Sequence, residues 1–367
     1  HLQNIINDVK QKGLMNFFRK YHKWSGIILT LLLILFALSG IVLNHRSELA
    51  KISVNRNALP KYVRYKNWNN AAVKDMYGVS KDSVMVYGNI GIWLTDSTLT
   101  EFEDMNIGFP SGIDNRKVSK ILKYKNNLYA GTLYGFFNYN NKNRKWNKIT
   151  LPIKEENVVD MYTKGDDLYV MLRSHLLVTK DAKHFYEVNM PSPAGYDNKI
   201  GLFKTLWLLH SGEIYGKIWI YVVDIIGIIM IFMSVTGFIL YLSKEKIKNK
   251  KNSREIRRKH GKRYKWNIKW HNKIGWITLI FLFINTTAGM FLRPPLLAAI
   301  FTSRVDKIPY TELDTPNPWY DILRRGVYLP EEDVLYHLLA SYSFYSLDTG
   351  IIQLAGPIKI NKEGVVF

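Results

Sequence analysis

The chain has 367 residues, no cysteine, and 51 Lys and Arg against 30 Asp and Glu, which gives a formal net charge of +21. The lack of cysteine excludes disulfides, iron–sulfur clusters, thiolate zinc sites, a cysteine nucleophile and covalent c-type haem. Segment 243–270 alone carries 13 Lys and Arg against Glu245 and Glu255, so it supplies +11 of the charge. Because this segment lies between two apolar runs, we interpret it as a positive-inside loop and expect no nucleic-acid binding.

Three apolar runs are long enough to cross a membrane as helices, at about 24–44, 216–242 and 274–292. The first is too long for a typical signal peptide and has no small-x-small cleavage site, so we expect it to remain as a helix. A chain that begins at His1 and ends at Phe367 is expected to be a processed, trimmed or truncated product.

The charge pattern also predicts the topology. Residues 1–23 are basic and, like the loop 243–270, are expected on the cytoplasmic side of the membrane. The large region after the first span is then periplasmic. The expected parts are a cytoplasmic segment with the first membrane helix (1–45), a periplasmic β-rich domain (46–209), membrane helices two and three with the basic loop (210–295), and a periplasmic β segment completing the outer domain (296–367).

A pair of short strands recurs with a period near 40 residues. The first apolar residues of three copies, Val84, Leu128 and Leu168, are 44 and 40 residues apart, and a fourth copy begins near Asp333. Such a period, with turn residues between alternating strands, is typical of β-propeller blades; a β-sandwich is the alternative. The expected fold is therefore a membrane protein with a three-helix transmembrane bundle and an all-β, propeller-like periplasmic domain. The copy after the third span predicts that the last two spans interrupt the series.

Histidines stand at the ends of the spans in a repeated pattern. His22 and His271 each precede a glycine by four residues and a second glycine by 18. Both are expected at the cytoplasmic face, while His45 and His210 are expected at the outer face. Two histidines on facing helices are the axial ligands that haem b needs, so we predict that these four residues bind haem iron as two pairs. A solvated histidine at the membrane interface is the alternative for each residue alone.

The number of haems, one or two, stays open. His22 and His45 are 23 residues apart, about 34 Å along one helix, which is long for a single electron hop. Asp224 is the one acid inside a span and is expected either to support a ligand or a proton relay, or to order the bundle. Arg46 and Arg293 stand at outer span ends, as helix anchors or as partners of haem propionates.

The remaining histidines have no metal-ligand spacing, and we interpret them as surface or turn residues: His175, His184, His260 and His337. No phosphate loop, dinucleotide fingerprint or catalytic triad motif appears. Electrons are therefore expected from a membrane quinol or from a separate reductase.

Four short motifs carry a resemblance to a known family. They are Tyr21-His22-Lys23-Trp24-Ser25-Gly26, Leu209-His210-Ser211-Gly212, Val235-Thr236-Gly237 and Trp270-His271-x-x-x-Gly275. Together they resemble the PepSY-associated transmembrane helix family, which includes iron-regulated inner-membrane proteins and ferrisiderophore reductases. The match covers about a quarter of the chain, at the three spans and their ends.

The resemblance implies haem b held at His22, His45, His210 and His271, and electron transfer to a periplasmic ferric chelate such as a ferric siderophore. Two features depart from the family: the outer region looks like propeller blades, and three spans are visible where four are common. A partner subunit or a second copy of the chain would supply a fourth helix. The alternative function is a propeller that binds or senses a partner, anchored by the spans in an envelope complex without redox activity.

Overall fold

The computed structural model describes residues 2–52, 55–58, 60, 72–192, 196–249, 253–331, 333–339, 344–346 and 352–353. The chain divides into two compact units, each built from two stretches of sequence. The helical unit comprises residues 1–46 and 198–314, and the sheet unit comprises 47–197 and 315–367. Segments 198–209 and 296–314, which lie outside the expected bounds 210–295 of the second membrane part, group with the helices.

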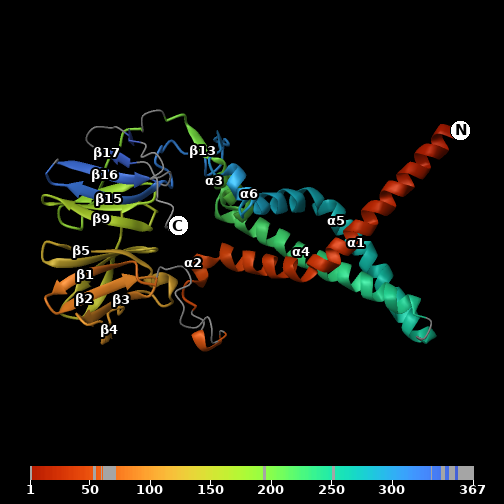
Figure 1. The fold of residues 1–367 in the computed structure, drawn as a ribbon, viewed down its shortest axis with the longest axis horizontal. Helices are drawn as coiled ribbons and strands as arrows, with labels where there is room; N and C mark the ends of the chain where they lie inside the picture. The colour runs from red at the N-terminus through yellow and green to blue at the C-terminus, as the bar shows by residue number, and fades with distance from the viewer. Residues whose placement is uncertain are drawn as a thin grey trace, which may run out of the picture. The chain divides into compact units, whose positions relative to one another are not determined.

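Three long helices dominate the helical unit: α1 (Leu2–Asn44), α4 (Lys217–Lys248) and α5 (Arg254–Phe291). Each contains a stretch that is long and apolar enough to cross a membrane, which confirms the three expected spans. Both α1 and α5 pack along α4 (Figure 1). Three smaller elements complete the unit: α3 (Leu202–Ser211), α6 (Leu296–Ile300) and a two-stranded sheet of β13 (Lys199–Gly201) and β14 (Arg304–Asp306).

A turn between two glycines separates α3 from the second span. Gly212 has a φ of +84° and ends α3 in the left-handed conformation that glycine adopts without strain. Gly216, with a φ of +80°, precedes the first residue of α4. A Cβ on Gly212 would lie 2.6 Å from the carbonyl oxygen of Trp219. His210 therefore belongs to a separate short helix and not to the membrane span that follows it.

Within the described residues, the sheet unit contains four antiparallel sheets of four strands, each with its strands in sequence order. The first sheet is β1 (Asp75–Ser80), β2 (Ser83–Gly88), β3 (Gly91–Asp96) and β4 (Phe102–Asp104). The second is β5 (Val118–Tyr124), β6 (Asn127–Thr132), β7 (Gly135–Asn140) and β8 (Lys145–Ile149). The third is β9 (Val158–Lys164), β10 (Asp167–Leu172), β11 (Leu176–Thr179) and β12 (Tyr186–Glu187). The fourth is β15 (Leu323–Leu329), β16 (Val334–Leu339), β17 (Phe344–Ser346) and β18 (Ile352–Gln353). The short helix α2 (Arg46–Leu49) lies at the boundary of the two units.

The strand pair that recurs in the sequence forms the two central strands of every sheet. The copy that begins near Val84 forms β2 and β3. The copy near Leu128 forms β6 and β7, and the copy near Leu168 forms β10 and β11. The fourth copy became β16 and β17, although residues 341–343 of that copy lie outside the described part of the chain. The prediction of repeated short antiparallel strands is therefore confirmed.

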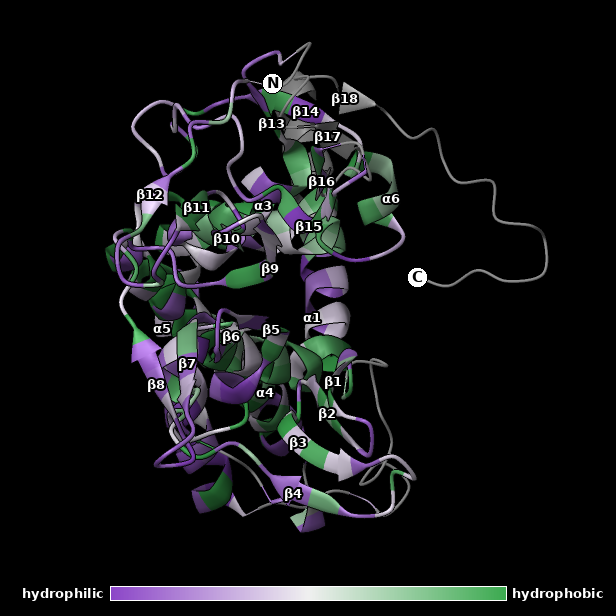
Figure 2. Ribbon diagram, turned by 90° about the vertical axis from the view of Figure 1, so that its left-hand side faces the viewer, coloured by the Kyte–Doolittle hydropathy of each residue, from purple (hydrophilic) through white to green (hydrophobic). Residues whose placement is uncertain are grey.

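Apolar side chains pack between successive sheets. Trp146 of the second sheet packs with Tyr87 and Ile92 of the first. Phe136 of the second sheet shares a cluster with Leu168 of the third. The exposed outer strands are more polar: in Figure 2, β8 is largely hydrophilic, whereas β9 is largely hydrophobic. Each sheet therefore buries apolar side chains against the next sheet along the chain.

The fourth sheet packs on the third although the two helices α4 and α5 separate them in the sequence. Trp319 and Leu323 share one buried cluster with Leu176 and Met190 of the third sheet and its following segment. His337 of β16 is fully buried, and its Nε2 lies 2.6 Å from the hydroxyl of Tyr162 on β9. The expectation that His337 is a surface or turn residue is wrong, because its ring is buried where the fourth sheet packs on the third.

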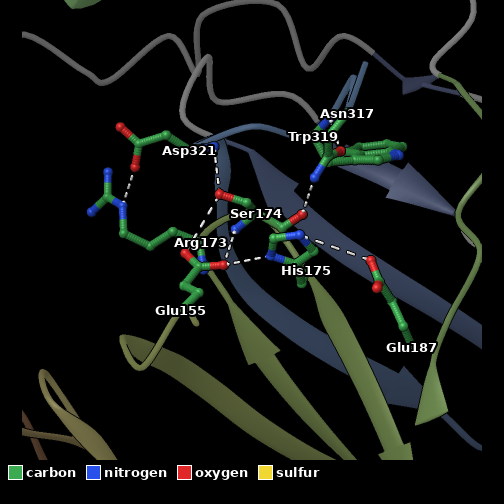
Figure 3. A network of polar contacts seen from close by, with 8 residues as sticks. All are labelled: Glu155, Arg173, Ser174, His175, Glu187, Asn317, Trp319 and Asp321. Atoms are coloured by element: carbon green, nitrogen blue, oxygen red, sulfur yellow. Dashed lines mark hydrogen bonds and ion pairs between the residues drawn. The ribbon is translucent and has the colours of Figure 1, made fainter. Parts of the chain in front are cut away.

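The segment that precedes β15 forms hydrogen bonds with the turn between β10 and β11, through Asn317 and Asp321 (Figure 3). Asn317 donates from Nδ2 to the carbonyl oxygen of Ser174 at 2.8 Å, and the backbone N–H of Asp321 donates to Ser174 Oγ at 3.0 Å. Arg173 pairs with Asp321. The carboxylate of Glu155 accepts hydrogen bonds from the backbone N–H groups of Arg173 and Ser174 in the same turn. These contacts explain how a short turn holds a chain segment more than 140 residues away.

His175 makes this network depend on pH. Its Nδ1 lies 2.8 Å from Glu155 Oε2 and its Nε2 lies 3.9 Å from Glu187, and the hydrogen bond to Glu155 raises the pKa of His175 above its ordinary value of 6.5. Protonated His175 therefore stabilises the fold fully below pH 6.5, and this stabilisation is lost as the pH rises through the folded-state pKa. We expect the stability advantage of the wild type over His175→Gln, measured by urea unfolding, to shrink between pH 6 and 8. The same scan on His184→Gln is the control, because the His184 side chain is 76% exposed; equal pH slopes for wild type and His175→Gln would contradict the prediction.

Candidate functional site

The side chains of His22 and His271 meet across two helices. Their ring centroids are 6.2 Å apart with an angle of 58° between the planes, so residues 249 positions apart in the sequence are neighbours in the bundle. We call them the first histidine pair. His22 lies on α1 and His271 lies on α5, and both helices pack along α4, whose Gly237 offers no side chain beneath His271. A Cβ on Gly237 would lie 3.4 Å from His271 Cε1.

A hydrogen bond from α4 sets the tautomer of His271. Thr236 Oγ1 donates to the carbonyl oxygen of Phe232 at 2.7 Å, so its hydroxyl proton is already used. The same oxygen lies 3.0 Å from His271 Nδ1 and accepts the proton of that nitrogen. Nδ1–H bonding to a neighbouring oxygen leaves the lone pair on Nε2, which is the form in which histidine binds a metal.

His210 has the same arrangement on another pair of helices. Its Nδ1 lies 3.0 Å from the backbone carbonyl oxygen of Asn285 on α5, an atom that only accepts, so Nδ1 carries the proton and Nε2 keeps its lone pair. The ring lies directly on Gly289, where a Cβ would come within 2.7 Å of His210 Cε1. Both His210 and His271 therefore sit on a glycine with Nδ1 held by the adjacent helix.

We expect Gly289→Ala to destabilise the helical unit by about 1–3 kcal/mol, because the added methyl group overlaps the His210 ring and overpacking carries this cost. Gly40→Ala is the matched control: a Cβ there meets nothing within 4 Å, and alanine favours a helix by about 1 kcal/mol over glycine. The measurement is unfolding in mixed micelles at rising SDS fraction. Equal stability of the two variants would show that His210 does not depend on Gly289.

His45 has a different environment from the other three histidines. Its Nε2 lies 2.6 Å from Asp224 Oδ2, and Asn44 Nδ2 donates to the second carboxylate oxygen at 3.2 Å. The ring also lies 5.5 Å from that of Tyr221. The described structure does not pair His45 with His210; each is held by its own neighbours. Asp224 is buried, lies two turns into α4 and joins α4 to the end of α1.

The two arginines at the span ends are exposed: Arg46 is the first residue of α2, and Arg293 follows α5. The glycines of the repeated pattern behave differently in the two helices. In α5, Gly275 packs on Met233 and Gly289 packs on His210, whereas a Cβ on Gly26 or Gly40 of α1 would meet nothing within 4 Å. The repeat therefore has a packing role in α5 that its counterpart in α1 lacks among the described residues.

Sequence reasoning did not find the residues that hold the histidines. Thr236 and Asn285 were not singled out for this role, and His260 was assigned to the surface although its Nδ1 is buried on α5. The signal was available: His260, His271 and Asn285 are 11 and 14 residues apart, close to whole numbers of helical turns. No group of three or more His, Asp or Glu that would hold a metal ion occurs in the part of the chain that the structure describes.

Comparisons with known proteins bear on the fold and the family. Part of the chain is similar to a protein in the solved "Crystal Structure of the N-terminal Domain of Nup159", with 14% identity over 32% of this chain and 30% of that chain and a TM-score of 0.23. A likeness of this extent carries no argument about the fold. No curated protein matches the chain.

The match to a protein family is more extensive. The family described as the PepSY-associated TM region matches residues 19–322, which include all four span-end histidines. These 304 residues are more than three quarters of the 367 in the chain. With three candidate membrane spans, the protein is a membrane protein, and it belongs to the PepSY-associated TM region family.

Proposed function

We propose that this protein is a bacterial inner-membrane haem b protein that passes electrons across the membrane to reduce a periplasmic ferric chelate, such as a ferric siderophore. The observation that carries the proposal is the distance between the rings of the first histidine pair. A metal–nitrogen bond is about 2 Å long, and the centre of an imidazole ring lies about 1 Å beyond its nitrogen, so two axial imidazoles on one iron have centroids about 6 Å apart. The 6.2 Å between His22 and His271 fits this requirement.

The surroundings of His271 support the same proposal. Its tautomer leaves Nε2 free to bind iron, and the hydrogen bond to Thr236 fixes the ring, as second-shell partners of metal-binding histidines do. Gly237 leaves room beside the ring. Haem b bound by the first pair would supply one-electron chemistry between ferrous and ferric iron, and the protein would set its potential through the ligands and their hydrogen bonds.

A second haem at His45 and His210 has weaker support than the first. His210 is prepared as a ligand in the same manner as His271, but Nε2 of His45 is engaged by Asp224. Ligation through that nitrogen requires His45 to leave the carboxylate. We therefore propose one haem at the first pair and treat the second as an outcome of the experiment.

The rest of the proposal assigns the two units. The four sheets would be blades of a propeller-like periplasmic domain that binds the ferric chelate, and the basic segment 243–270 would place the inner ends of α4 and α5 in the cytoplasm. A membrane quinol or a separate reductase would supply the electrons. A chelate with hard oxygen ligands binds Fe(II) more weakly than Fe(III), so reduction releases the iron as Fe(II).

The test is the visible spectrum of the purified protein, air-oxidised and dithionite-reduced, after expression with ample haem. We expect a sharp b-type α-band that is lost in His22→Ala and in His271→Ala and retained in His184→Ala, whose exposed ring lies in the sheet unit. The fraction lost in His210→Ala shows whether a second haem is present. If the wild-type protein has no Soret band, the reductase proposal fails, and a membrane-anchored binding, sensing or scaffold role takes its place.

A further inference from the structure

One face of α5 carries a line of polar side chains along most of its length. His260, Asn267, His271, Thr278 and Asn285 follow one another at intervals of 7, 4, 7 and 7 residues. At 100° per residue these positions fall within about 40° of arc, and they extend about 37 Å along the helix axis. We call this line the α5 polar stripe. His271 places it on the side of α5 that packs on α4, through the contacts of its ring with Thr236 and Gly237.

The stripe contains buried polar atoms that find no partner among the described side chains and backbone. They are His260 Nδ1, Asn267 Oδ1 and Asn285 Oδ1. Asn267 is only 5% exposed, and its Nδ2 is already committed to the carbonyl oxygen of Arg263 at 2.9 Å. A buried polar atom without a hydrogen bond is unfavourable, and more so at Asn285, which lies in the membrane-spanning part of α5.

Direct contact between helices does not account for these atoms. Polar residues that only join membrane helices bond across the interface, as Asn44 and His45 of this chain do with Asp224. The amide oxygens of Asn267 and Asn285 make no such bond, although the carbonyl of Asn285 accepts from His210. Between His271 and Thr278, Gly275 meets the end of Met233, an unbranched side chain that can change its rotamer.

Water is the ligand that fits a line of donors and acceptors of this kind. Buried waters typically make about three hydrogen bonds to polar groups that lack partners. Intramembrane polar residues that face the bundle interior commonly line aqueous or proton pathways. The stripe begins at His260, in the charged half of α5 that water reaches, and ends at Asn285, beside the ring of His210.

We propose that the α5 polar stripe lines a solvent track between α4 and α5, in which bound water molecules enter the membrane-spanning bundle from the basic end of α5 and reach the neighbourhood of His210. The track solvates Asn267 and Asn285 and provides a route along which protons can move into the bundle. It goes beyond the proposed haem and does not depend on it.

The absence of native cysteine allows a direct test by single-cysteine labelling in lipid bilayers. Cysteine reacts with water-soluble methanethiosulfonate reagents as the thiolate, which forms in water and not in hydrocarbon. Two adjacent pairs of positions compare the stripe with the lipid-facing side at the same depth. The first pair is Thr278→Cys with Ile277→Cys, and the second is Asn285→Cys with Ile284→Cys, since Ile277 and Ile284 are 67% and 44% exposed on the bundle surface.

We expect the stripe cysteine of each pair to react about tenfold or more faster than its neighbour, because each unit by which burial raises the thiol pKa lowers the thiolate fraction tenfold. Rates that are equally low within both pairs mean that the α4–α5 contact is dry, and the proposal fails. The labelling is done with and without added haem, so its outcome is independent of the spectra of the proposed function.

A measurement without substitution guards against variants that do not fold. Hydroxyl radicals generated from water by X-rays oxidise the side chains that bound water touches. We expect oxidation of Met233, whose methyl group lies at Gly275 beside the stripe, in the intact protein in bilayers. Protection of Met233 together with inert cysteines at residues 278 and 285 would overturn the proposal.

Discussion

Trp319→Ala should lower the free energy of unfolding of the sheet unit by about 3–5 kcal/mol, the range measured for removing a large aromatic side chain from a core. Trp319 is 2% exposed and lies in the cluster that joins the third and fourth sheets. Its indole N–H also donates to the carbonyl oxygen of Met190 at 3.3 Å, and truncation leaves that acceptor without this bond.

The measurement for Trp319 is hydrogen–deuterium exchange of β9–β11 and β15–β16 in the intact protein. We expect exchange to accelerate in both sheets together, because the cluster is shared. Tyr186→Ala is the control, since Tyr186 is 69% exposed, and its effect should stay within about 0.5 kcal/mol. Accelerated exchange confined to the fourth sheet would contradict a shared core.

The second large effect is expected at the polar contact between α1 and α4. Asp224 is buried and accepts from both His45 and Asn44. His45→Leu should therefore destabilise the helical unit by about 3–5 kcal/mol, since it leaves a buried carboxylate short of its main partner. Asp224→Leu should also destabilise the helical unit, because the imidazole of His45 and the amide of Asn44 then lose their acceptor.

The double variant His45→Leu/Asp224→Leu distinguishes a coupled pair from two independent residues. We expect its destabilisation to be clearly smaller than the sum of the two single effects, since the apolar pair leaves neither partner unsatisfied. SDS-induced unfolding in mixed micelles gives the three values on one scale. Additive losses would show that His45 and Asp224 act separately, and would weaken the assignment of Asp224 to ordering the bundle.

The parts of the fold that follow from local pattern were predictable. The spans follow from long apolar runs, and the central strand pair of each sheet follows from alternation between turn residues, as at Leu128 and Leu168. The proximity of His22 and His271 was predicted from the side of the membrane on which each span begins, and the two rings meet. Their role as haem ligands stays a prediction.

Other features depend on contacts that sequence pattern does not encode. The placement of His210 on a separate helix depends on two glycines with positive φ, which the apolar run of the following span obscures. The bond of His45 to Asp224 joins residues 179 positions apart, and the burial of His337 depends on the packing of a strand whose own sequence reads as half-exposed. The contact of His45 and the burial of His337 are set by tertiary packing, which overrides the local pattern.

The division of the sheet unit into residues 47–197 and 315–367 has a consequence for how the protein is made. A ribosome completes the third sheet long before it reaches Trp319, and the membrane hairpin of α4 and α5 must insert in between. Until then, the apolar side chains of Leu176 and Met190 have no cover from the fourth sheet. During synthesis, the incomplete sheet unit therefore exposes an apolar surface on its third sheet. Aggregation and chaperone binding are expected at this stage rather than after the fold is complete.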